Sequence, residues 1–138
     1  MPTPASPTPP AAPASEAATF IEQFAHRVAT RDQPAPPPAH GYDQASLEAL
    51  IAQALKARQP GLRITRALTQ ARICYALMQH PRLNTKDLAA AAGLTRLTVY
   101  TAFPDLQRLN LATDEHRAGR RYHFLTHPGE DWLLAVTR

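Results

Sequence analysis

The 138-residue chain has very little cysteine and no long apolar run. Its single cysteine, Cys74, excludes an intramolecular disulfide and a zinc site built from several cysteines. No run of about 18 apolar residues occurs, so we expect no membrane-spanning helix. The first basic residue is Arg27 and prolines interrupt the stretch before it, so we expect no secretion signal. These absences favour a cytoplasmic protein.

Motifs for catalysis are also lacking. The five glycines form no phosphate-binding loop, no serine occupies a nucleophile elbow, and no carboxylate pair has a suggestive spacing. His123 and His127 are four residues apart but fall on an expected strand and turn, so they form no metal-binding helix face. His116 and His123 could face each other across a hairpin and bind a metal or sense protonation, although two exposed histidines are the favoured interpretation. We predict no enzyme, no metal and no cofactor.

Proline is concentrated near the N-terminus, where residues 1–40 hold ten of the fourteen. Such a composition buries too little apolar surface to offset chain entropy, so residues 1–41 are predicted to be a disordered Pro/Ala-rich arm. Residues 17–31 differ because they form a short amphipathic segment. This segment either docks on the chain's own domain or binds a protein partner from a flexible tether. Its apolar face would consist of Phe20, Ile21, Phe24 and Val28.

The clearest predicted helix covers residues 43–58. Asp43 can cap its start, and Tyr42 and Leu47 flank the cap as a hydrophobic staple. Gln59-Pro60-Gly61 ends it, and a second helix follows over residues 64–80. The stripe on the first helix belongs either to the core of one chain or to a dimer contact. It consists of Leu47, Leu50, Ile51, Ala54 and Leu55.

Two shorter helices joined by a glycine turn are predicted within residues 84–111. Asn84 can cap the first, and Gly93 ends it because glycine accepts a left-handed backbone. Thr95 can cap the second, which we expect to end near Phe103, since Pro104 inside a helix costs about 3 kcal/mol. A further segment would restart at the proline. The buried face of the second helix would be Val99, Ala102, Phe103 and Leu106.

A basic hairpin and a last helix follow. Residues 111–116 and 121–126 are predicted strands around the turn Arg117-Ala118-Gly119-Arg120. Asp114 and Glu115 on the first strand could pair with the arginines at this turn. Thr126 can cap a terminal helix that continues through Val136.

Together these motifs resemble the winged-helix DNA-binding domain of bacterial MarR-type and related ArsR- and PadR-like transcription regulators. The resemblance covers residues 68–134 and is carried by LTQARICYALMQHP, NTKDLAAAAGLTRLTVYTAF, LQRLNLA and GRRYHFLTHPGEDWL. It implies a mainly α fold with a small β-hairpin wing, in a single domain over residues 42–138. MarR-type proteins dimerise through long helices at both ends, and this chain has only a short terminal helix. We therefore favour a dimer contact through Leu47, Leu50, Ile51 and Leu55.

The resemblance also implies sequence-specific binding of double-stranded DNA by a homodimeric, nucleoid-associated regulator. Residues 61–138 carry eleven Lys/Arg and six Asp/Glu, whereas residues 1–60 carry four and five, so the positive charge lies on the expected reader. The recognition helix, residues 95–103, would contact DNA through Thr95, Arg96, Leu97, Thr98, Tyr100 and Thr101. The Arg-rich wing, residues 111–126, and the backbone-contacting positions would act through Thr85, Lys86, Arg117, Arg120 and Arg121.

Two other functions use the same fold. The chain could be an interaction adaptor whose winged helix docks on protein while its proline-rich arm recruits another partner. It could also be an accessory DNA-binding factor for plasmid or phage replication or transfer, which differs only in its target.

Overall fold

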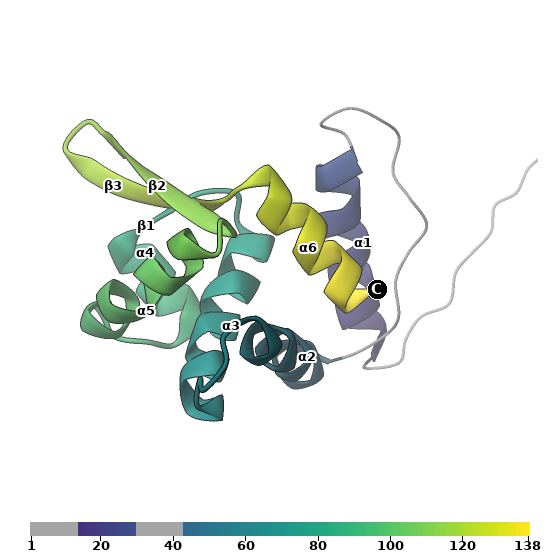
Figure 1. The fold of residues 1–138 in the computed structure, drawn as a ribbon. Coiled ribbons are helices and arrows are strands. Elements are labelled where there is room, and N and C mark those ends of the chain that lie inside the picture. The colour runs from purple at the N-terminus through teal and green to yellow at the C-terminus, as the bar shows by residue number, and fades with distance from the viewer. Residues whose placement is uncertain (1–13, 30–42) are drawn as a thin grey trace, which may run out of the picture.

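The computed structural model describes residues 14–29 and 43–138 (Figure 1). The prediction of a disordered arm therefore falls mostly outside the described residues, and residues 14–29, which include most of the amphipathic segment predicted at 17–31, are helical. Within the described residues the elements are α1 (Ala14–Ala29), α2 (Gln44–Arg58), α3 (Ile64–Gln79), β1 (Leu83–Asn84), α4 (Thr85–Ala92), α5 (Arg96–Arg108), β2 (Ala112–Arg117), β3 (Arg120–Leu125) and α6 (His127–Thr137).

Side-chain caps set the starts of four helices, as the sequence predicts. Each capping oxygen accepts a hydrogen bond from the backbone N–H three residues ahead, which satisfies a donor that the helix itself leaves free. Gly93 ends α4 with a φ of 69°, the left-handed conformation that glycine adopts at little cost. The capping residues are Asp43, Asn84, Thr95 and Thr126.

Helices α3, α4 and α5 together with the sheet form a winged helix-turn-helix, as predicted. The sheet has the order β1-β3-β2, and Figure 1 shows the β2–β3 hairpin extending beyond the helices. The turn is shorter than expected, because Ala118 and Gly119, with φ values of 53° and 78°, close it alone. Strand β1 was not predicted, since two residues carry no alternating pattern. It pairs with β3 by placing Leu83 opposite His123.

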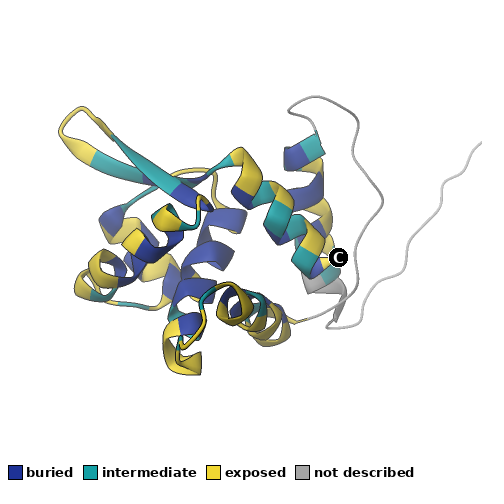
Figure 2. Cartoon of the chain, viewed as in Figure 1, coloured by how far each residue is buried: buried dark blue, intermediate teal, exposed yellow. Residues whose placement is uncertain are grey.

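The core corrects the dimer interpretation of the stripe on α2. Leu47, Ile51 and Leu55 are 0% exposed within the single chain because α3 and α6 pack on α2. Only Leu50 faces outward, at 37% exposure. Figure 2 shows the buried residues of the helices converging on this interior. The stripe that we expected a second copy to bury is therefore buried by helices of the same chain.

Helix α1 docks on the same domain, against α3 and α6 (Figure 1). Ile21 and Phe24 are buried, and the ring of Phe20 lies 4.7 Å from that of Tyr75. The guanidinium of Arg27 donates to the carbonyls of Leu77 and Met78 at the end of α3, where the helix dipole favours a cation. The apolar face that could have bound a partner is thus covered intramolecularly.

Helix α5 corrects the prediction at Pro104. The helix runs without interruption from Arg96 to Arg108, with the proline inside it. A proline leaves one carbonyl of the preceding turn without its helical donor. The helix nevertheless continues because the residues after the proline are fixed to the core, where Asp105 is 7% exposed and Leu106 0%.

Candidate nucleic-acid interface

Helix α5 turns one face to the core and the other to solvent. Val99, Ala102 and Phe103 are buried, so the structure orients the helix as the sequence predicts. Leu97 and Tyr100 are exposed by 71% and 50%, respectively. The predicted reading positions are all accessible, with Thr98 half-buried and the others exposed: Thr95, Arg96, Leu97, Tyr100 and Thr101.

A groove of about 650 Å³ separates the start of α5 from the wing. It brings together residues from three separate parts of the chain. The starts of α4 and α5 form one wall, and the hairpin forms the other. The lining residues are Asn84, Thr85, Lys86, Asp87, Arg96, Tyr100, His116, Gly119, Arg120 and Arg121.

The groove is positively charged. Lys86, Arg96 and Arg120 are exposed and have no ion pair with any residue that the structure describes. The groove is lined by a single acid, Asp87. The N-terminal end of α4, with its partial positive charge, opens into the same space. This combination attracts an anionic ligand.

The wing arginines are not equivalent, although the sequence predicted one role for all three. Arg121 donates from Nε to Asp114 across the hairpin at 2.6 Å. Arg117 pairs with Glu115 at 3.3 Å, and Glu115 also pairs with Arg82. Two of the three wing arginines are therefore paired with acids, as anticipated from the sequence. Arg120 is the wing arginine with a free charge among the described residues.

Thr85 is placed differently from its predicted role as a backbone contact. It is 8% exposed, and its hydroxyl shares a 2.9 Å hydrogen bond with Nε2 of His123. The ring of Phe103 packs edge-on against the imidazole at 4.4 Å. Thr85 thus joins α4 to β3, and although it lines the groove it is largely buried and its hydroxyl is engaged by His123.

The position of His123 contradicts both interpretations of the wing histidines, namely a facing pair and two exposed side chains. The register places Asp114 opposite His123 and Arg121 opposite His116, so the two histidines do not face each other. His123 is 1% exposed and His116 is exposed at the groove. Burial, with a contribution from the nearby charge of Arg121, lowers the pKa of His123 to about 4.

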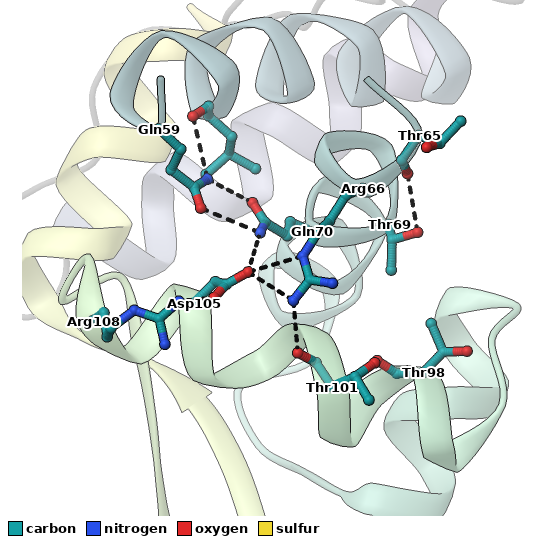
Figure 3. A network of polar contacts seen from close by, with 10 residues as sticks. Gln59, Thr65, Arg66, Thr69, Gln70, Thr98, Thr101, Asp105 and Arg108 are labelled. Atoms are coloured by element: carbon teal, nitrogen blue, oxygen red, sulfur yellow. Dashed lines mark hydrogen bonds and ion pairs between the residues drawn. The ribbon is translucent and has the colours of Figure 1, made fainter. Parts of the chain in front are cut away.

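A polar network that the sequence did not reveal holds α5 against α3 (Figure 3). Oδ2 of Asp105 accepts hydrogen bonds from Arg66 Nε at 3.1 Å and from Gln70 Nε2 at 2.9 Å. Gln70 is fully buried, and Gln59 donates to its Oε1 at 2.7 Å. Arg66 also donates to the carbonyl of Thr101, at 3.0 Å. The only cue in the sequence is a glutamine on the apolar face of α3.

Within residues 14–29 and 43–138 no helix is long and apolar enough to cross a membrane. In the same part of the chain no three His, Cys, Asp or Glu side chains gather where they could bind a metal ion.

Three solved structures are similar to this chain. A MarR family transcriptional regulator from Silicibacter pomeroyi matches 67% of the chain with 22% identity and a TM-score of 0.45, and the chain spans 65% of that regulator. HlyU from Vibrio cholerae matches 69% of the chain and 94% of its own length, with 16% identity and a TM-score of 0.43. The adhesin competence repressor AdcR from Streptococcus pyogenes matches 68% of the chain and 69% of its own length, with 21% identity and a TM-score of 0.42. No family model and no curated protein matches the chain.

Proposed function

We propose that this chain binds double-stranded DNA, with α5 in the major groove and the β2–β3 wing along the sugar-phosphate backbone. The observation that carries the proposal is the cationic groove between the start of α5 and the wing. A major groove about 12 Å wide admits a helix of about 10–12 Å diameter. A phosphate strand at its edge would then lie in the groove, against Lys86 and Arg120.

The proposal assigns sequence choice and affinity to two different kinds of contact. Arg96, which is exposed in the first turn of α5, would donate two hydrogen bonds to a guanine edge. Lys86 and Arg120 supply affinity without sequence choice, because phosphates are the same at every base pair. The wing arginines bound to Asp114 and Glu115 contribute less, since their charge is already partly neutralised.

We extend the proposal to a bacterial transcription regulator that acts in the cytoplasm and is not an enzyme. It would act by occluding a promoter or operator. A single reading helix contacts only a few base pairs, so two copies on neighbouring half-sites would give a longer and more specific site. The homodimer would use a surface other than the buried stripe of α2. Sedimentation of the protein with and without its DNA site measures this stoichiometry.

The test is the salt dependence of duplex binding. The slope of log affinity against log salt concentration reports the phosphates neutralised, at about 0.9 per contact. We expect Lys86→Ala and Arg120→Ala each to make the slope shallower by about 0.9 on every sequence. Lys56→Ala is the matched control, because Lys56 is exposed on α2 and does not line the groove. Fluorescence anisotropy with a labelled duplex measures all four proteins.

A wild-type slope near zero would contradict DNA binding and would favour the adaptor function. Equal slopes for the groove variants and Lys56→Ala would show that duplex DNA does not enter this groove.

A further inference from the structure

The exposed side of α5 carries a second apolar stripe. Leu97 and Tyr100, at 71% and 50% exposure, are two of only four large apolar side chains that are exposed in the described residues. Thr101 and Pro104 are exposed at the following positions of the same face. Helix α5 therefore has an apolar surface toward solvent as well as one toward the core.

The threonine hydroxyls on this helix are engaged within the helix. Thr95 Oγ1 accepts from the N–H of Thr98 at 3.1 Å and shares a 2.9 Å hydrogen bond with Thr98 Oγ1. Thr101 Oγ1 donates to the carbonyl of Thr98 at 3.0 Å. A hydroxyl whose proton is redirected toward a ligand would lose such a bond. The hydroxyl of Thr101 has already donated its proton, so it can only accept a hydrogen bond from a ligand, whereas its methyl group can make apolar contacts.

Polar surfaces flank the stripe on both sides. Toward the wing lies the cationic groove that contains Arg96, Tyr100 and Arg120. Toward α3 lies a hollow of about 190 Å³ that contains Thr101 and Arg66, and Figure 3 shows the guanidinium of Arg66 at the backbone carbonyl of Thr101. A narrow apolar strip between two polar, partly cationic borders complements a DNA major groove, where phosphates border the base edges on both sides.

The thymine 5-methyl is the apolar group that base pairs present in the major groove. We propose that Leu97, supported by the methyl group of Thr101, is a specificity-determining residue that selects duplexes by contact with thymine 5-methyl groups. This inference rests on the proposed function and adds to it the feature of the base sequence that is read. Arg96 would select guanine beside these thymines. The recovered sites would therefore join a guanine to a short thymine run.

The experiment removes single methyl groups from the DNA. Bound duplexes are first recovered from a randomised pool, and each thymine of the recovered site is then replaced by deoxyuridine, which lacks only the 5-methyl group. For the wild-type protein we expect about fourfold weaker binding at one or two positions, as loss of one buried methyl predicts. The measurement needs no protein variant, so it does not depend on the folding of one.

Leu97→Ala assigns the contact to the residue. At the sensitive positions this variant should bind thymine and deoxyuridine duplexes equally, whereas its salt slope stays that of the wild type, because leucine neutralises no phosphate. Leu50→Ala is the matched control, since Leu50 is also an exposed leucine but lies on α2. It should keep the full difference between thymine and deoxyuridine.

Two outcomes would overturn the inference, and they are distinguishable. Salt-dependent duplex binding that is indifferent to deoxyuridine at every position would refute methyl recognition while leaving the proposed function intact. No salt-dependent duplex binding, with Leu97→Ala instead abolishing an association of the protein with a second copy in sedimentation, would refute both and assign the stripe to a protein interface.

Discussion

At the scale of single residues, His123 is a buried group whose protonation opposes folding. It is 1% exposed, its Nδ1 has no hydrogen-bond partner in the described residues, and burial lowers its pKa from 6.5 to about 4. The unfolded chain therefore takes up the proton at a higher pH than the folded chain. As the pH falls from 6.5 to about 4, the folded state loses up to about 3 kcal/mol of stability.

We expect His123→Gln to flatten this part of the pH profile. The variant lacks the titrating group, so its free energy of unfolding should change less between pH 6.5 and pH 4, even if its stability at neutral pH is also lower. Urea unfolding at a series of pH values measures both curves. Parallel curves for the two proteins would show that another group titrates.

Sequence reasoning succeeded for single residues whose partners are local. The caps Asn84 and Thr95 bond to backbone three residues away, so their pattern is visible in the chain. Thr85 and His123 are separated by 38 residues, and nothing near either of them indicates the other. From the sequence alone, a threonine at a helix start is expected to be exposed. The strand that covers Thr85 becomes evident only in the folded structure.

At the scale of elements, α5 shows how tertiary contacts override a local rule. Proline disfavours a helix interior, and the sequence alone therefore predicted a break at Pro104. The network around Asp105 joins the turn after the proline to α3, and Arg66 fixes the turn before it through the carbonyl of Thr101. The prediction failed because the side chains that hold both turns come from another helix.

We expect Asp105→Ala to destabilise the fold by about 3 kcal/mol. The substitution removes the carboxylate that accepts a hydrogen bond from the fully buried amide of Gln70 and that pairs with Arg66 and Arg108. Asp105→Asn keeps an acceptor oxygen but no charge, so its loss should be smaller. Urea unfolding measures the series, with the exposed Glu22→Ala as a control that should change stability by less than about 0.5 kcal/mol. An unchanged midpoint for Asp105→Ala would mean that the network does not stabilise the fold.

At the scale of the whole molecule, the sequence predicted the winged helix-turn-helix but not how its two preceding helices are used. An amphipathic stripe shows that a helix is covered on one face, and its composition is the same whether the cover is the same chain or a second copy. Helices α1 and α2 both carry such stripes, and both are covered within one chain. Their arrangement depends on α6, whose packing on α1 and α2 is set by contacts distant in sequence.

Two leucines on α2 test this arrangement, because they share a helix and differ in environment. Leu55 is 0% exposed and Leu50 is 37% exposed. Leu55→Asp would bury a carboxylate without a partner and remove apolar packing worth about 2–5 kcal/mol, so we expect the protein to unfold. Leu50→Asp should remain folded with a melting temperature close to that of the wild type. Circular dichroism measures folding and sedimentation measures mass for both variants. If the wild type were a dimer and Leu55→Asp were a folded monomer, the stripe of α2 would be a subunit interface. That result would contradict the packing of α2 on α3 and α6.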